Sequence, residues 1–248
     1  MLFHAEIPLT ISDSLKYNPS WGSLLHGAIM ELLPSEYVSQ LHQPGPKPLA
    51  QHVFRESNDQ IIWSVSSLDE KMTLELSAAL LQRLPMDIKL NQKATTIRLE
   101  QPRKTEQTTY LELADKHFKS PVVNRQHHIR LATPTSFKTA GQYVIFPTTD
   151  LIMNSLMQRW DANADKLTLF DPDVREHLGT HVQITDYRLH SSSFSVNGAW
   201  LKGFAGQIEL TVRGPEALAR VASLLIDFGR FSGVGVKTAL GMGGFQID

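Results

Sequence analysis

Residues 228 to 244 read FGRFSGVGVKTALGMGG, a glycine-rich run that follows an amphipathic helix and precedes a short final strand. Flexible linkers are rich in Gly and Ser and lack apolar residues, whereas Val234, Val236 and Leu240 are interleaved here, so the run is expected to pack against something. Glycine allows positive φ and lets backbone N–H groups approach an anion closely. With Arg230 and Lys237 beside it, the run predicts contact with a phosphate.

Length and composition limit the possible classes of protein. The chain has 248 residues, of which 42% are hydrophobic and 20% charged, so it can bury a core and is expected to form two compact domains. The absence of cysteine excludes disulfides and thiolate zinc sites. No segment has the roughly 18 consecutive apolar residues that span a bilayer, and the N-terminus lacks a signal pattern, so we expect a cytoplasmic protein with no membrane partner.

Charge is distributed unevenly along the chain. The formal net charge of −1 is unlike the strongly basic balance of most nucleic-acid-binding domains. Between residues 98 and 138, however, eight Lys and Arg residues stand against four Asp and Glu residues. Such a run fits a solvated surface and a phosphate-contacting patch about equally well, and both interpretations stay open.

The pattern of apolar residues predicts the same order of elements twice. In the first half the order is strand, helix, two strands, helix and further strands. The expected segments are an extended run over 2–11, a helix over 21–33 broken by Pro34, a hairpin over 51–56 and 60–66, a helix over 69–84, and extended stretches over 93–100 and 108–113.

The second half repeats this order with longer connections. Its expected segments are strands over 127–133, 143–146, 183–189, 204–212 and 244–247, a helix over 150–160, and a helix that Pro215 opens and Gly229 closes. Two copies of a split β-α-β fold explain the pattern, each a four-stranded sheet with two helices on one face. We therefore expect an α+β protein with ferredoxin-like domains over 1–120 and 121–248.

The chain resembles a known family in several segments. The run over 228–244 resembles the C-terminal glycine-rich signature of the CRISPR-associated endoribonucleases that process precursor CRISPR RNA, members of the RAMP superfamily. The segments TPTSF at 133–137, YVIFP at 143–147 and GFAG at 203–206 resemble the second domain of that family. Leu41-His42 followed by Gly45-Pro46-Lys47 resembles its N-terminal active-site region. The resemblance covers nearly the whole chain.

The resemblance implies a fold and a reaction. The fold is two tandem ferredoxin-like (RNA-recognition-motif-like) domains. The reaction is cleavage of precursor CRISPR RNA within its repeats without a metal or cofactor, by attack of a 2′-hydroxyl on the adjacent phosphate to leave a 2′,3′-cyclic phosphate and a 5′-hydroxyl. The expected partner is repeat RNA, with transfer of the product to a CRISPR effector complex. Both a monomer and a homodimer are compatible with the sequence.

Candidate catalytic residues follow from matching positions. His42 and Lys47 match the histidine and lysine of the family, which suit proton transfer and stabilisation of phosphorane charge. Some members carry a tyrosine in the first helix where this chain has Met30, and His26 lies one helical turn before Met30 and could substitute. The alternative interpretation makes His26 a packing residue and His42 a residue favoured by the helix dipole.

The set of expected RNA-binding residues lies mostly in the glycine-rich run. It comprises Arg230, Gly233, Gly235, Lys237, Thr238, Gly241, Gly243 and Gly244 in the run and Lys138 outside it. Phe137 beside Lys138 fits base stacking and core packing alike. His177 and His181 have a helical spacing typical of metal ligands, but no further ligands accompany them, so we expect no metal site.

Two other functions stay open. A binding-only relative would hold repeat RNA without cutting it, because its set of proton-transfer residues is incomplete. A tandem ferredoxin-like regulator would bind a mononucleotide in the glycine-rich run.

Overall fold

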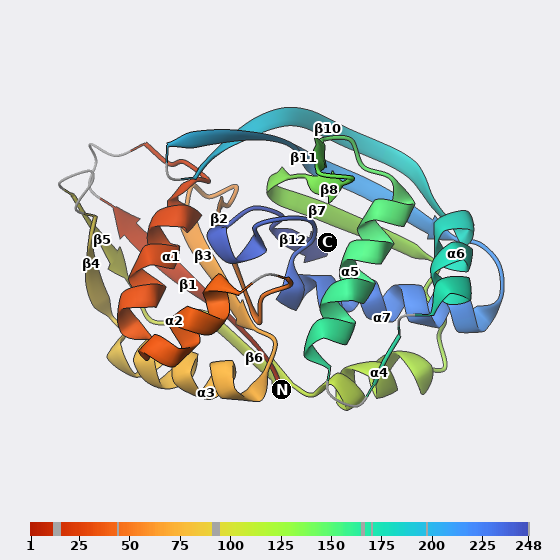
Figure 1. Cartoon of the computed structure of the whole chain (residues 1–248), viewed down its shortest axis with the longest axis horizontal. Coiled ribbons are helices and arrows are strands. Elements are labelled where there is room, and N and C mark those ends of the chain that lie inside the picture. The colour runs from red at the N-terminus through yellow and green to blue at the C-terminus, as the bar shows by residue number, and fades with distance from the viewer. Residues whose placement is uncertain are drawn as a thin grey trace.

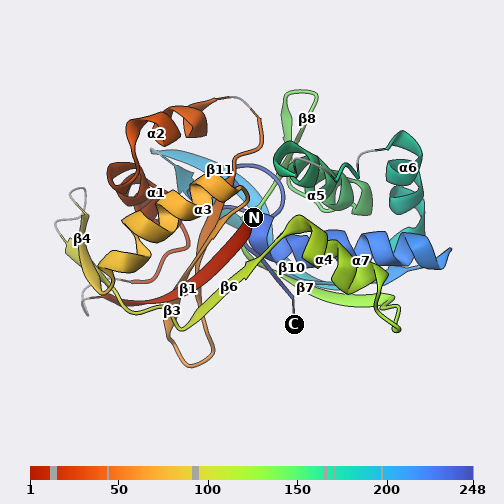
Figure 2. The ribbon, with the colours of Figure 1, turned by 90° about the horizontal axis from the view of Figure 1, so that it is seen from below.

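The protein places two antiparallel β-sheets side by side, with helices on one side of each sheet (Figure 1; Figure 2). The computed structural model describes residues 1–11, 16–43, 45–90, 95–164, 167–169, 171–196 and 198–247, and within these ranges the side chains of Gln40, His42, Leu90 and Thr95 are not described. No helix in the described ranges is long and apolar enough to cross a membrane. The expected α+β class with tandem ferredoxin-like domains is confirmed.

The first half contains most of the strands and helices that the sequence predicts, together with additional ones. In chain order they are β1 (Leu2–Ile11), α1 (Trp21–Leu32), α2 (Ser35–His42), β2 (Leu49–Arg55), β3 (Ile61–Ser67), α3 (Glu70–Ala79), the 3-10 helix η1 (Leu81–Arg83), β4 (Met86–Leu90), β5 (Thr95–Leu99), β6 (Lys104–Thr108) and α4 (Tyr110–Phe118). The break between α1 and α2 falls at Pro34, as expected.

The first sheet has six strands instead of the expected four. Its order is β2-β3-β1-β5-β4, and β6 also pairs with β1. The reason is the length of β1, which has ten residues, whereas β5 and β6 have five each. β5 pairs with Leu9–Ile11 and β6 with Leu2–Glu6, so the two short strands occupy successive parts of β1.

The prediction of a strand over 108–113 is wrong, because helix α4 begins at Tyr110. The Thr109 side chain accepts from the N–H of Glu112, and the Glu112 carboxylate accepts from the N–H of Thr109. This reciprocal capping box is visible in the sequence as Thr-x-x-Glu. Tyr110, Leu113 and Ala114 of α4 join the core of the second half, although α4 precedes the predicted domain junction at residue 120. The position of that junction stays a prediction.

The second half completes the chain with a four-stranded sheet, as expected. Its elements are β7 (Gln126–Thr135), β8 (Phe137–Thr139), β9 (Gln142–Val144), α5 (Thr149–Asn163), α6 (Pro172–His181), β10 (Val182–Val196), β11 (Ala199–Val212), α7 (Glu216–Ser232), the 3-10 helix η3 (Thr238–Leu240) and β12 (Phe245–Ile247). The sheet order is β10-β11-β7-β12, and β8 and β9 form a separate hairpin. The long β10–β11 hairpin extends across the molecule toward α1 (Figure 1).

Helix α7 continues past its predicted end at Gly229. Its last residue is Ser232, and the following Gly233, whose φ is 63°, takes the chain out of the helix. Gly229 serves packing instead, because a Cβ there would lie 2.7 Å from the ring of Phe245. The last helix therefore leads directly into the glycine-rich run.

The two largest hydrophobic cores of the described residues lie between the helices and the sheets. Trp21 and Trp63 are buried in the first core, which also contains Ala239 of the glycine-rich run. Trp160, Phe228 and Tyr110 are buried in the second, where the ring centroids of Tyr110 and Trp160 lie 4.8 Å apart. Each core thus contains residues from both halves of the chain.

Candidate active site and RNA-binding surface

The predicted catalytic residues lie on α1, on α2 and in the segment that follows. His42 is the last residue of α2, and its side chain falls outside the described part of the structure. His26 is half-buried in α1, and Met30, one turn later, packs against the first core. Lys47 is half-buried before β2, and its partial burial lowers its pKa because desolvation disfavours the ammonium form. The helices α1 and α2 lie next to each other (Figure 1).

Helix α1 is held against the glycine-rich run by direct backbone contact. Gly22 in its first turn faces Gly241, and a Cβ built on Gly22 would lie 2.8 Å from the Cα of Gly241 and 3.0 Å from the carbonyl oxygen of Leu240. Both glycines are buried. The position of the helix that carries His26 therefore depends on the C-terminal run.

Gln51 in β2 links the same two segments by hydrogen bonds. Its Nε2 donates to the carbonyl oxygens of Gly22, at 2.6 Å, and Ala239, at 2.9 Å. Its Oε1 accepts from the indole N–H of Trp63 at 2.8 Å. Because Gln51 is only 2% exposed, these bonds satisfy a polar group that would otherwise be costly to bury.

The glycines of the run make close contacts with the protein itself. A Cβ on Gly235 would clash with the carbonyl oxygen of Ser136, and one on Gly244 would lie 2.5 Å from Cγ of His52. The values of φ at Gly233, Gly235, Gly241 and Gly243 are 63°, 80°, 108° and 65°. Positive φ and tight packing thus explain why glycine occupies these positions. That they also contact RNA stays a prediction.

Other residues of the run differ in exposure. Thr238 is buried, with 2% of its surface exposed, whereas Lys237 is exposed and adopts a left-handed conformation with φ of 56°. Of the two cations predicted to contact RNA phosphates here, Lys237 is therefore the more accessible to solvent.

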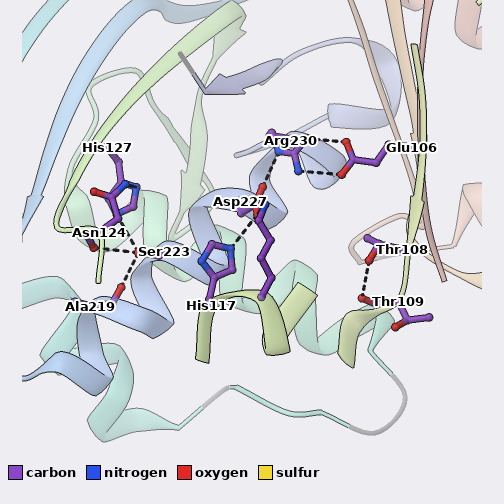
Figure 3. A network of polar contacts seen from close by, with 11 residues as sticks. Glu106, Thr108, Thr109, His117, Asn124, His127, Ala219, Ser223, Asp227 and Arg230 are labelled. Carbon is purple, nitrogen blue, oxygen red and sulfur yellow. Dashed lines mark hydrogen bonds and ion pairs between the residues drawn. The ribbon is translucent and has the colours of Figure 1, made fainter. Parts of the chain in front are cut away.

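Arg230 is part of a polar network that joins the two halves (Figure 3). Its guanidinium donates to both carboxylate oxygens of Glu106 in β6, at 3.0 and 3.2 Å, and to Asp227 at 2.7 Å. The other oxygen of Asp227 lies 2.6 Å from Nζ of Lys116 and 2.9 Å from Nε2 of His117, both in α4. Arg230 thus connects α7 to the first sheet.

The charges in this network reinforce one another. Burial alone would raise the pKa of Asp227, but the His117 hydrogen bond and the positive charges of Arg230 and Lys116 outweigh burial and lower it. Burial likewise opposes the charged form of Arg230, and the two carboxylates outweigh it to raise the pKa of Arg230. A phosphate at Arg230 would compete with Glu106 and Asp227, and RNA contact at Arg230 stays a prediction.

Lys138 and Phe137 lie on opposite faces of strand β8. Lys138 is exposed, which leaves it accessible to RNA. Phe137 is 4% exposed and packs near Phe204, with ring centroids 6.1 Å apart. Of the two interpretations, base stacking and core packing, its position fits core packing.

His177 and His181 lie on one face of α6. Their ring centroids are 5.6 Å apart, and Nδ1 of His181 is 2.9 Å from the carbonyl oxygen of His177. Among the residues that the structure describes, no group of three or more His, Cys, Asp or Glu residues could hold a metal ion.

Comparison with known proteins identifies the family. The model of the CRISPR-associated endoribonuclease Cas6 family matches residues 129–245. A Cas6 endoribonuclease of Streptococcus thermophilus is 33% identical over 90% of this chain and 89% of its own length. The chain belongs to the Cas6 family. A Cas6 endoribonuclease of Mycobacterium tuberculosis is 30% identical over 92% of this chain and 71% of its own. A solved Cas6 product complex is 25% identical and covers 100% of both chains with a TM-score of 0.79.

This Cas6 family member also has a cavity between its two sheets that the sequence did not predict. Its volume is about 450 Å³, and residues from β1, β2, β3, the turn between β2 and β3, β6, β7, α7 and β12 line it. Arg103, Lys104 and Arg130 of the basic run line the cavity together, although Arg130 lies far from the other two in sequence. The excess of basic residues between 98 and 138 was the available signal, but it could not show that these three converge.

Two histidines also line this cavity. His4 lies 2.9 Å from the Ser66 hydroxyl, measured from Nδ1, and His52 is buried. Burial lowers the pKa of His52 to about 3, so this imidazole is neutral at physiological pH. Nothing in their sequence surroundings distinguishes these strand residues from core histidines.

Proposed function

We propose that this endoribonuclease cuts precursor CRISPR RNA within its repeats, without a metal, through residues on α1, α2 and the segment before β2. Family membership carries the proposal, and the attachment of α1 to the glycine-rich run supports it. The run then has a second role besides RNA binding, because its backbone fixes the position of a helix that carries a candidate catalytic residue.

The reaction needs two proton transfers and stabilisation of negative charge. A base removes the proton of the 2′-hydroxyl, the 2′-oxygen forms a bond to phosphorus, and the bond from phosphorus to the 5′-oxygen breaks as an acid protonates that oxygen. We assign the proton transfers to His42 and His26, because imidazole titrates near neutral pH and each such transfer is worth roughly 10² to 10⁴ in rate. Lys47 would stabilise the charge on the phosphorane.

Cleavage of a labelled RNA carrying the CRISPR repeat of the source genome tests the proposal. We expect product in the presence of EDTA, a 2′,3′-cyclic phosphate end, and no product when the nucleotide before the scissile phosphate is 2′-deoxy. Binding without product over a long incubation would instead support the binding-only alternative, which Met30 in α1 motivates. Preference for a mononucleotide over repeat RNA would support the regulator.

Single substitutions then separate the catalytic roles. His42→Ala is expected to lower the single-turnover rate by at least about 100-fold with little loss of RNA affinity. If only His26→Ala lowers the rate, the assignment of His42 is wrong. Lys47→Ala should also lower the rate more than the affinity. Transfer of product to an effector complex and the cytoplasmic location stay predictions, and both a monomer and a homodimer stay open.

A further inference from the structure

The tip of the β10–β11 hairpin has two chemically different faces. Phe194 pairs with Leu201 and Ser195 pairs with Trp200 in the antiparallel register, so successive pairs point to opposite sides. On the inner face, Phe194, Val196 and Leu201 pack with Leu240 and Met242 of the glycine-rich run. The outer face carries Ser193, Ser195, Trp200 and Lys202.

The tip is also fixed to the first helix. The backbone N–H of Ser195 donates to Oγ of Ser20 at 2.8 Å, and Ser20 is the N-cap residue directly before α1. Phe194 beside it is fully buried. The outer face is therefore presented by a strand pair that is anchored to α1 and to the glycine-rich run.

Trp200 stands out on this face because its large aromatic side chain is exposed to solvent and does not pack in a core. It is 66% exposed, whereas Trp21, Trp63 and Trp160 are at most 1% exposed. Two positions along the strand, Lys202 donates from Nζ to Oγ of Ser193 at 2.8 Å. Residues 188–204 contain Arg188, His190 and Lys202 and no Asp or Glu. An exposed indole on the same face as the Lys202 ammonium group complements a nucleic acid, which offers flat bases and phosphate charge.

We propose that Trp200 stacks on an unpaired base of the bound repeat RNA and that Lys202 contacts a neighbouring phosphate. Aromatic side chains bind unpaired bases by stacking, and a tryptophan with few rotatable bonds on an anchored hairpin loses little entropy when it does so. The inference rests on the proposed function, because it names the surface that holds the same RNA. It also places this contact on the hairpin that is joined to α1.

Tryptophan fluorescence gives a direct readout of this contact. The other three tryptophans are buried, so quenching by RNA reports on Trp200. The probe is repeat RNA with a fluorescein end label for anisotropy, made uncleavable by a 2′-deoxy nucleotide before the mapped scissile phosphate. We expect saturable quenching with the same midpoint as the anisotropy change. Trp200→Phe should lose the quenching.

Affinity measurements on matched variants complete the test. Trp200→Ala should weaken RNA binding by about fivefold to a hundredfold, and Trp200→Phe, which keeps a stacking ring, should stay within about threefold of wild type. Phe118→Ala is the control, because Phe118 is another exposed aromatic, on α4 away from the hairpin. Lys202→Gln should reduce the slope of log affinity against log salt, which Trp200→Ala should leave unchanged.

Two results would overturn the stacking proposal without affecting the proposed endoribonuclease function. One is RNA binding without a change in Trp200 fluorescence, which would leave the outer face for a protein partner. The other is equal affinity in wild type and Trp200→Ala. Binding and quenching without cleavage would support the stacking contact and count against the proposed function. Wild-type protein that neither binds nor cuts the repeat would overturn both.

Discussion

Gly22 and Gly241 touch across the two halves of the chain with no room for a side chain between them. A Cβ on Gly22 would lie 2.8 Å from the Cα of Gly241, and a Cβ on Gly241 would lie 2.9 Å from the Cα of Gly22. Because both neighbours are backbone, neither can rotate away. The close approach of α1 to the glycine-rich run thus requires glycine on both sides.

Gly22→Ala should therefore destabilise the protein by about 1 to 3 kcal/mol, the usual cost of overpacking. Gly27→Ala is the matched control in the same helix, where no described atom apart from the adjacent residues and the helix's own backbone lies within 4 Å of the added Cβ. It should be neutral or stabilise by up to about 1 kcal/mol, because alanine favours helix. Urea unfolding of both variants measures the difference, and equal stabilities would contradict the contact.

Gln51→Leu should lower the free energy of unfolding by about 2 to 4 kcal/mol. The substitution leaves the indole N–H of Trp63 and two carbonyl oxygens without their buried partner. Gln107→Leu in β6, where the side chain is exposed, should change stability by no more than about 0.5 kcal/mol. Thermal or urea unfolding is the measurement, and a small loss at Gln51 would mean that the three groups find other partners.

Asp227→Asn should destabilise the protein by about 3 kcal/mol at neutral pH, because it removes a buried charge from beside Arg230 and Lys116. The pKa of Asp227 is lower in the folded state than in the unfolded state. Its carboxylate therefore contributes its full stabilisation above the unfolded pKa of about 3.9, and this stabilisation is lost as the pH falls through the lower folded pKa. The stability gap between wild type and variant should then narrow as the pH falls below about 4.

The exposed ion pair of Asp115 and Lys119 provides the control for this pH dependence. Its carboxylate lies 2.6 Å from Nζ of Lys119, but both side chains are largely exposed. Asp115→Asn should change stability by less than about 1 kcal/mol. A gap at Asp227 that stays constant down to pH 2 would contradict the assignment.

Arg230 and Lys237 should respond differently to substitution, although the sequence predicts phosphate contact for both. Arg230→Gln should lower stability, since it breaks the pairs with Glu106 and Asp227. Lys237→Gln should leave stability within about 0.5 kcal/mol, weaken RNA binding and reduce the salt slope by about 0.7 to 0.9. Unfolding curves and binding at several salt concentrations distinguish them. Unchanged RNA affinity in Lys237→Gln would contradict its predicted phosphate contact.

Much of the fold was accessible to prediction because its signals are local. Pro34 ends the first helix, Pro215 opens the last, and the turn at 57–59 joins two strands that pair in register. Helix α4 also has a local signal, the Thr109 and Glu112 capping pair, although residues 108–113 fit an extended pattern as well. The six-stranded sheet was not accessible, because two short strands share one edge of β1 only when the chain is folded.

The sequence alone determined the tandem ferredoxin-like architecture and the family, because periodicity, turn residues and the glycine-rich signature are written in consecutive positions. Only the tertiary structure decided what those residues contact. It paired Arg230 with Glu106, 124 positions away, and it placed Gly241 against Gly22. It also left Trp200 exposed on an anchored hairpin. Partners so distant in sequence are set by the packing of the two halves, and no local pattern encodes them.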